Sequence, residues 1–328
     1  MKVKRFDPAI DTEAWNRFVQ QGKNSTFLFQ REFMDYHADR FQDHSLMIFN
    51  EKGQLVSLMP ANITNEREVI SHQGLTYGGF VLQPECKLET TIAVIYQALC
   101  FLKEQNIRVL KLKLFPGFYN SDATDEIEYI LFLLNAVLYR RDVAFAINQK
   151  HRILYTGNIR REAAKAEKQG AKVVANASTD EFWEQLLVPG LNSRFGVSPV
   201  HTAAEIKKLQ NAFPQNIRQY NCYMDGELVA GTTLFVTAQV AHCQYISSNE
   251  KGRKSGALNY LFKHLLDEVY ADIPIFDFGI VNEKEGREIN TGMLFWKEGF
   301  GGRARKHDFY QIDTTTYTLL EPFVEERL

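Results

Sequence analysis

The sequence predicts a mixed α/β protein that consists of two similar units in tandem. Residues 45–61 form two apolar runs around a polar turn, and residues 219–236 repeat this arrangement. The tetrapeptide Gly-x-Leu-Val follows the turn in both copies, starting at Gly53 and at Gly226. A turn glycine between two apolar runs is typical of a β-hairpin. Hairpins that are each followed by a helix and another strand indicate mixed sheets covered by helices.

The helices and strands after each hairpin follow the same order. In the first copy a helix over 88–105 leads into a strand over 107–115, and in the second a helix over 255–270 leads into 273–280. The second helix has a stripe of apolar residues at helical spacing, which predicts one buried face: Leu258, Leu261, Phe262, Leu265, Leu266 and Val269. The repeat predicts domains at residues 1–155 and 156–328.

Two more elements complete the second copy. A helix over 157–172 is predicted to start at Asn158 as N-cap and to stop at Gly170. A last helix over 290–299 is predicted to end at a glycine, and a strand follows from Arg303.

Composition excludes several classes of protein. The chain has 328 residues, of which 45% are hydrophobic and 24% charged, and its formal net charge is −2. These values are typical of soluble globular proteins and do not favour general binding of nucleic acids or membrane surfaces. The four cysteines are far apart, so we expect no disulfide framework, no metal site and a reducing compartment. No apolar leader and no run of membrane-spanning length is visible, and we therefore expect a cytoplasmic protein without membrane insertion.

A basic, glycine-containing turn separates the strand before residue 249 from the helix near 255. Helix starts present unpaired N–H groups with partial positive charge, and glycines let backbone approach a ligand closely. One interpretation is a cradle for a pyrophosphate or a similar anion, and the other is an ordinary solvated loop. The first copy has no such turn. The cradle would consist of Lys251, Gly252, Arg253, Lys254, Ser255, Gly256 and Ala257.

The predicted helix over 157–172 carries a basic face made by Arg161, Lys165, Lys168 and Lys172. Glu162 and Glu167 neutralise part of it, so the face is either simply solvated or directed at phosphate groups.

Two residues near the C-terminus are candidates for chemistry. Asp277 shares one face of an otherwise apolar strand with Gly279, where a carboxylate is costly without partners. It is either a general base or a structural aspartate. Lys297 follows Trp296 at a helix end, where it either complements the helix dipole or directs positive charge at a reacting carbonyl.

The order of these segments resembles the acyl-CoA-binding acetyltransferase (GNAT) superfamily, and more closely its FemAB-type branch, in which two such units stand in tandem. The matching segments run along most of the chain: residues 71–79, 159–170, 199–202, 205–209, 251–258, 276–279 and 295–301. The resemblance implies two GNAT-like domains with a cleft between them. Because only the second copy has the basic turn, we expect the acyl donor in the second domain and the acceptor in the first.

The resemblance also implies an N-acyltransferase. Backbone amides of Arg253 to Ala257 would hold the pyrophosphate of acetyl-CoA or another acyl-CoA, although the glycine spacing departs from the usual Gln/Arg-x-x-Gly-x-Gly/Ala. Fem peptidyltransferases instead use aminoacyl-tRNA, and they resemble this chain in the segment that begins at Phe295. There Lys297 would sit near the transferred carbonyl. Similar chains in cell-surface sugar biosynthesis make an amino sugar an attractive acceptor.

Amine acylation requires a positioned donor, a proton acceptor and a stabilised oxyanion. We expect exposed amides of Cys243 to Ser247 to help position the donor. The proton acceptor is left open between His201, Asp277, Tyr245 and a water between them. Candidates for the acceptor side are Tyr77, Gly78, Arg161 and Lys165.

The leading hypothesis is a CoA-dependent N-acyltransferase that acts on a small molecule such as a nucleotide-linked amino sugar of a cell-envelope precursor, with no metal and no DNA partner. One alternative is aminoacyl-tRNA-dependent transfer to a peptidoglycan precursor, the only case in which tRNA is a partner. The other is a non-catalytic binding protein with a GNAT fold.

Overall fold

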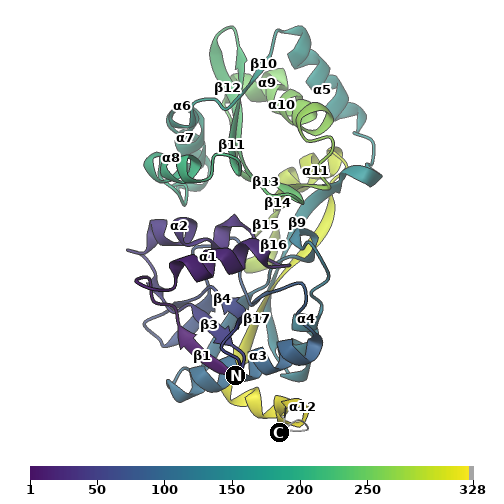
Figure 1. Cartoon of the computed structure of the whole chain (residues 1–328). Helices are drawn as coiled ribbons and strands as arrows, with labels where there is room; N and C mark the ends of the chain where they lie inside the picture. Colours follow the sequence, from purple (N-terminus) through teal and green to yellow (C-terminus); the bar gives the residue numbers. More distant parts are fainter. Residues whose placement is uncertain (325–328) are drawn as a thin grey trace. The chain divides into compact units, whose positions relative to one another are not determined.

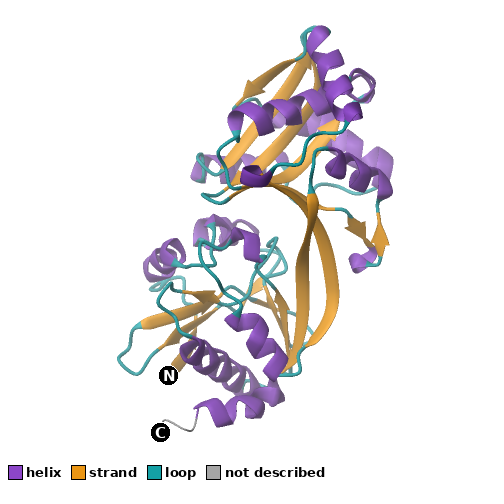
Figure 2. Cartoon of the chain, turned by 90° about the vertical axis from the view of Figure 1, so that its right-hand side faces the viewer, coloured by secondary structure: helices purple, strands orange, loops and turns teal. Residues whose placement is uncertain are grey.

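The chain folds into two compact units in a computed structural model (Figures 1 and 2). The structure describes residues 1–324, apart from the side chains of Arg194 and Phe195. Unit 1 contains Met1–Asp142 and the chain from Lys306 onward, and unit 2 is Val143–Arg305. Both units combine sheets and helices, so the predicted mixed α/β class is confirmed.

Unit 1 contains two groups of strands. The first has the order β1-β3-β4-β7 and is antiparallel throughout. The second has the order β17-β8-β6-β5-β2. The strands that lie entirely in this unit are β1 (Lys2–Arg5), β2 (Gln42–Asp43), β3 (Leu46–Phe49), β4 (Leu55–Met59), β5 (Asn62–Ile63), β6 (Glu68–Ser71), β7 (Val81–Leu82) and β8 (Val109–Lys113).

The core of unit 1 forms where α3 packs against both groups of strands. Apolar residues of α3 such as Ile95 and Leu99 share one buried cluster with Ile48 of β3 and Leu110 of β8. The helices of this unit are α1 (Thr12–Gln21), α2 (Arg31–Met34), α3 (Leu88–Glu104), α4 (Glu126–Leu133) and α12 (Glu321–Val324).

Unit 2 is one layer of strands with helices on both faces (Figure 1). Its strands have the order β10-β11-β12-β13-β14-β9, and only the pair β13–β14 is parallel. Alternate residues of β11 divide between the faces, since Tyr220 and Cys222 pack with α10 whereas Asn221 bonds to Ser178 beside α6. The strands are β10 (Lys172–Ala175), β11 (Ile217–Met224), β12 (Glu227–Val236), β13 (Val240–Ser248) and β14 (Ile275–Ile280).

The helices of unit 2 fall into two sets with a short hairpin beside them. One face of the sheet carries α5 (Gly157–Lys168), α9 (Glu250–Ser255) and α10 (Ala257–His264), and the other carries α6 (Thr179–Phe182), α7 (Val188–Phe195) and α8 (Ala203–Ala212) (Figure 1). The rest of the unit contains β15 (Asn282–Glu283), β16 (Glu288–Ile289) and α11 (Thr291–Gly299).

Two long strands, β9 (Val137–Asn148) and β17 (Arg303–Asp313), contribute residues to both units. In unit 2, residues 144–148 of β9 pair with β14. In unit 1, residues 309–313 of β17 pair with β8. The compact units therefore differ from the division of the sequence into 1–155 and 156–328, because the last strand of the second repeat completes the sheet of the first unit.

Most predicted elements are confirmed, with two corrections at helix starts. Both hairpins form, as β3–β4 and β11–β12. The helix predicted from Asn158 starts at Gly157, since the N-cap is Thr156. The helix predicted from residue 255 corresponds to α10, which starts at Ala257, and a separate short helix, α9, starts at Glu250 directly after β13, where the Asn249 side chain accepts the Gly252 N–H at 2.8 Å. Within residues 1–324, no helix has the length and apolar character needed to cross a membrane.

Candidate active site in the second unit

The parallel strands β13 and β14 separate after a short paired stretch. Residues 240–242 pair with 275–277, and β13 then continues to Ser248 without β14 beside it. Gly279, with φ of +74°, turns β14 away at this point, and the pairing of β14 with β9 is irregular over the same residues. The edge of β13 from Cys243 onward is therefore left without a neighbouring strand on this side, among the residues described.

A β-bulge in β13 determines on which face of the sheet the side chains after residue 243 lie. Thr233 of β12 pairs with Tyr245 and Leu234 pairs with Cys243, so Gln244 is the extra residue. A bulge of this kind shifts the alternation of side chains along a strand. Cys243 consequently packs in the core under α10, whereas Tyr245 packs against Trp183 on the opposite face. His242, which precedes Cys243, points to the same face as Tyr245.

A chain of hydrogen bonds links Lys297 to His242 through Asp277. The Lys297 ammonium donates to the carbonyl oxygens of Gly279 and Ile280 at 2.9 and 2.7 Å. The N–H of Gly279 donates to Oδ1 of Asp277 at 2.8 Å, and Nδ1 of His242 lies 2.7 Å from Oδ2. Because a carboxylate only accepts hydrogen bonds, Nδ1 carries the proton of this bond and the basic lone pair lies on Nε2. The arrangement fits a general base oriented by a carboxylate.

Lys297 is a buried cation, with 2% of its surface exposed. Burial lowers its pKa from 10.5 to about 8, while the nearby Asp277 acts in the opposite direction. At neutral pH the ammonium is thus mostly charged and can make its two hydrogen bonds to backbone oxygens. In this structure Lys297 fixes the backbone that follows Asp277.

His201 and Tyr245 form a second buried pair on the same face. The Tyr245 hydroxyl accepts the backbone N–H of His201 at 3.2 Å and lies 2.5 Å from Nδ1 of the same residue. Burial raises the pKa of Tyr245 to about 12. The phenol is therefore protonated at neutral pH.

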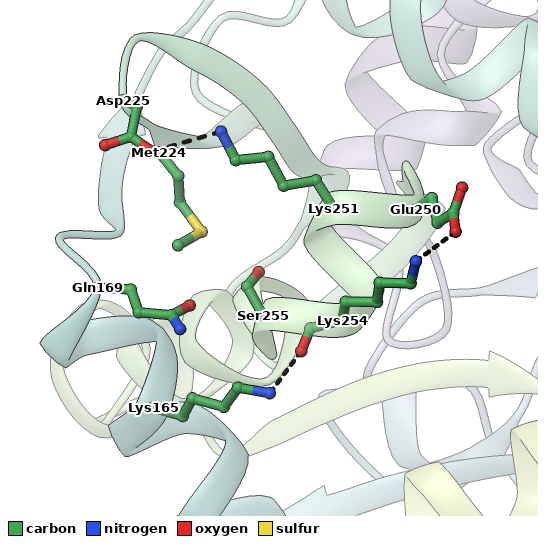
Figure 3. A pocket seen from close by; sticks show the side chains of 8 residues that line it. All are labelled: Lys165, Gln169, Met224, Asp225, Glu250, Lys251, Lys254 and Ser255. Carbon is green, nitrogen blue, oxygen red and sulfur yellow. Dashed lines mark hydrogen bonds and ion pairs between the residues drawn. The ribbon is translucent and has the colours of Figure 1, made fainter.

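A pocket of about 810 Å³ lies where β13 runs into α9 (Figure 3). It is lined by residues of α5, of the turn between β11 and β12, and of α9: Lys165, Gln169, Met224, Asp225, Glu250, Lys251, Lys254 and Ser255. Three lysines against two acids leave this pocket with a positive balance. Three residues of the predicted cradle and the predicted Lys165 thus meet at one pocket.

Each pocket lysine has a protein partner, as the dashed lines in Figure 3 show for several of these contacts. Lys254 pairs with Glu250 at 2.6 Å and Lys251 pairs with Glu227 at 3.0 Å, and Lys165 donates to the carbonyl oxygen of Lys254 at 2.6 Å. Solvent-exposed pairs of this kind contribute little, about 0–1 kcal/mol each. An incoming anion can therefore replace the acids at low cost.

The remaining cradle residues have structural surroundings. A Cβ at Gly252 would collide with the carbonyl oxygen of Val229, and one at Gly256 with that of Glu162. These glycines admit neighbouring protein backbone, which corrects the expectation that they let a ligand approach. Arg253 donates to the carbonyl oxygen of Ser248 at 2.8 Å, and Ala257 is fully buried.

The predicted acceptor residues are dispersed. Tyr77 is buried in unit 1, with its hydroxyl 3.0 Å from that of Thr26. A Cβ at Gly78 would collide with the carbonyl oxygen of Ser71, so close packing explains this glycine. Arg161 is exposed on α5 and does not line the pocket that Lys165 lines. Within residues 1–324, no cluster of three His, Cys, Asp or Glu residues could hold a metal ion.

Sequence reasoning missed His242. Its partner Asp277 lies 35 residues away, and their contact depends on the parallel register of β13 and β14. A histidine and an aspartate on two successive strands were the only available signal, because register between strands joined by a helix cannot be read from one sequence.

Comparison with known proteins supports the architecture described above. Residues 154–288 match the family model of the acetyltransferase (GNAT) domain. The crystal structure of FemX is similar over 98% of this chain and 100% of its own, at a TM-score of 0.68 and 12% identity. The C-terminal domain of a putative lysylphosphatidylglycerol synthetase from Agrobacterium fabrum is similar over 97% and 96%, at a TM-score of 0.60 and 13% identity.

A tandem GNAT protein from the clavulanic acid biosynthesis pathway is similar over 95% of this chain and 98% of its own, at a TM-score of 0.52 and 10% identity. No curated protein matches the chain in sequence. The predicted resemblance is confirmed in the fold: the chain has a tandem GNAT fold similar to that of FemX, and residues 154–288 of its second unit match the GNAT domain model.

Proposed function

We propose that this FemAB-like tandem GNAT protein, an acyltransferase, takes its acyl group from acyl-CoA and transfers it to an amine, such as an amino sugar of a cell-envelope precursor. The observation that carries the proposal is the separation of β13 from β14 beside the His242–Asp277 pair. Unpaired backbone groups along a strand edge suit the amide-bearing arm of CoA, which can add to them as a strand does. The reacting thioester would then lie next to a base.

The phosphate groups of the carrier would occupy the pocket at the far end of β13. Lys165, Lys251 and Lys254 line it, and the acids that hold them are largely exposed. A pyrophosphate offers several charge-assisted hydrogen bonds in place of single carboxylate contacts. The support for this placement is that α9, four residues of which line the pocket, follows β13 directly in the chain.

The proposed transfer is a direct attack. The amine nitrogen forms a bond to the thioester carbonyl carbon, the proton of the amine passes to Nε2 of His242, and the carbon–sulfur bond breaks. The departing thiolate takes a proton from Tyr245, whose raised pKa keeps it protonated at neutral pH. Lys297 keeps the backbone after Asp277 in place, so His242 stays oriented.

A second candidate is aminoacyl-tRNA-dependent transfer to a peptidoglycan precursor. Two observations favour it: the full-length similarity to FemX, and the position of Lys297 in the Phe-Trp-Lys segment beside the candidate site. Under this alternative, exposed cations of α5 such as Arg161 would face the phosphates of the tRNA.

Donor binding separates the two candidates. Under the CoA proposal, acetyl-CoA should raise the melting temperature in a saturable way, because a ligand that binds only the folded state adds about 2.7 kcal/mol at 100 times its Kd. The double change Lys251→Glu and Lys254→Glu should abolish this shift. The matched control, Lys168→Glu with Lys172→Glu, reverses two exposed cations outside the pocket and should leave it unchanged.

A shift with aminoacyl-tRNA but not with acetyl-CoA would select the second candidate. If neither donor shifts the melting temperature and neither supports transfer to an amine, a non-catalytic binding role replaces both.

A further inference from the structure

We infer that a surface of unit 2 around Leu154 docks onto a membrane leaflet that carries anionic lipids. This surface, called the Leu154 surface below, consists of Ile153 and Leu154 in the segment between β9 and α5, with the nearby cations Lys150, Arg160 and Arg303. It is separate from the pocket and from the candidate catalytic residues, and it has no role in the proposed transfer.

Its apolar residues are unusually open to solvent. Leu154 is 88% exposed and Ile153 is 43% exposed. Phe295 of α11 is 69% exposed. It lies one helical turn before Gly299 and therefore lies on the same side of α11 as Gly299. Large apolar side chains that gather on one surface mark an interaction site.

The segment is held firmly in place. The N–H of Thr156 donates to the carbonyl oxygen of Gly299 at 2.9 Å, and the rings of Tyr155 and Phe300 lie 5.6 Å apart. A Cβ at Gly301 would come within 2.6 Å of the carbonyl oxygen of Ile153. The glycines after α11 thus let the Leu154 segment lie directly against the start of β17, where Arg303 begins the strand.

The charge in this part of the sequence is mainly positive, although Arg152 pairs with Asp267 at 2.8 Å and Lys306 with Glu128 at 2.7 Å. Residues 149–161 and 299–306 contain seven lysines and arginines and no aspartate or glutamate, although the whole chain has a net charge of −2. Among the residues that the structure describes, Lys150, Arg160 and Arg303 make no ion pair, unlike the pocket lysines. Unpaired cations around exposed leucine and isoleucine complement the headgroups and acyl chains of an anionic leaflet.

A leaflet fits this surface better than a nucleic acid. Cations alone would serve either partner, because both carry phosphates. Exposed aliphatic side chains add nothing to the affinity for a phosphate backbone. When they insert among lipids, they lower the free energy of docking. Stacking on bases requires aromatic rings, and the two large apolar side chains exposed in the segment itself, Ile153 and Leu154, are aliphatic.

Vesicle sedimentation tests the inference on the full chain without any donor, so its outcome is independent of the proposed transfer. Vesicles of phosphatidylcholine with and without phosphatidylglycerol serve as the probe, at low and at physiological salt. We expect binding to the anionic vesicles that weakens as salt rises. Ile153→Ser with Leu154→Ser, and separately Arg160→Glu with Arg303→Glu, should each weaken it at least about tenfold.

Two controls match these variants. Phe132→Ser changes a residue of α4 that is 75% exposed in unit 1, and Lys168→Glu with Lys172→Glu reverses two exposed cations away from Leu154. Both should bind vesicles like the unaltered chain. No binding to anionic vesicles, or binding that survives the Ile153–Leu154 change, overturns the inference. Binding of tRNA that depends on Arg160 and Arg303 without any vesicle binding assigns the surface to RNA instead.

Discussion

His242 and Asp277 are the last paired residues of two parallel strands, and their side chains bond across the pair at 2.7 Å. Beyond them β13 stays paired with β12 but has no β14 beside it. The strands thus place an oriented imidazole at the point where one edge of β13 loses its neighbouring strand. The proposed acyl transfer depends on this relationship.

The first prediction concerns the base. His242→Gln should lower kcat by about 100-fold or more, because general-base catalysis contributes on this scale, while the Kd for the donor stays within about twofold. His151→Gln removes an exposed histidine of the same unit and should change neither value. Steady-state kinetics and donor titration measure both. If kcat is unaltered in the His242 variant, His201 or a water acts as the general base instead.

The second prediction concerns Lys297. Replacement by methionine removes the donor that holds the carbonyl oxygens of Gly279 and Ile280, so the orientation of Asp277 and His242 should loosen. We expect kcat to fall at least about tenfold with a smaller change in KM. The dependence of the remaining activity on pH should also change, because Asp277 and His242 are less well oriented in the variant.

Lys297 also gives a pH signature in stability. Its folded pKa of about 8 lies below the unfolded value of 10.5, so protonation favours the unfolded chain. This contribution is fully present above pH 10.5 and is lost as the pH falls through 8. The unfolding free energy of the original chain, minus that of Lys297→Met, should therefore rise as the pH increases through this window. A difference that is flat from pH 8 to 10 would contradict the burial argument.

The third prediction concerns buried histidines of unit 1. Burial is the main cause that lowers the pKa of His72 from 6.5 to about 3 and that of His44 to about 4. Both pKa values are depressed in the folded state, so stability is complete above pH 6.5 and is lost as the pH falls toward 4 and then 3. Urea unfolding from pH 7 to 4 should show this loss.

His72→Gln should make that pH dependence shallower, since one of the two histidines no longer titrates. His151→Gln is the control, because this residue is exposed. Equal slopes for both variants would show that other groups cause the acid destabilisation.

The fourth prediction concerns two glycines with left-handed backbone. Gly256 and Gly170 have φ of +81° and +79°, but only Gly256 faces a neighbour, the carbonyl oxygen of Glu162. Alanine at Gly170 should cost about 1–2 kcal/mol from backbone strain alone. Alanine at Gly256 should cost clearly more, because α5 must also move away. Unfolding free energies compare the two, and equal losses would argue against close packing at Gly256.

Local patterns made much of the fold predictable. The hairpins at 45–61 and 219–236 formed where turn glycines separated apolar runs. The helix predicted over 290–299 forms as α11, whose N-cap Asn290 accepts the N–H of Met293. These features depend on a few consecutive residues, so one sequence contains all the information they need.

The candidate site was only partly predictable for the opposite reason. Asp277 attracted notice as a carboxylate on an apolar strand and Lys297 as a cation at a helix end, but the contact of Asp277 with His242 is set by strand register. Gly252 and Gly256 suggested a flexible phosphate loop, whereas α9 starts at Glu250 and both glycines pack against backbone. A sequence does not distinguish a glycine that makes room for a ligand from a glycine that makes room for a neighbouring segment of the chain.

The crossing of β17 into the first unit affects how this chain is made. Since residues 309–313 pair with β8, the sheet of the first unit stays incomplete until residue 313 has been synthesised. The edge of β8 that later binds β17 therefore has no partner strand while about two hundred further residues are synthesised. At usual rates of translation this takes roughly ten to forty seconds. A nascent chain stalled before residue 303 would keep an unsatisfied strand edge, and chaperones that protect such edges should be needed longest there.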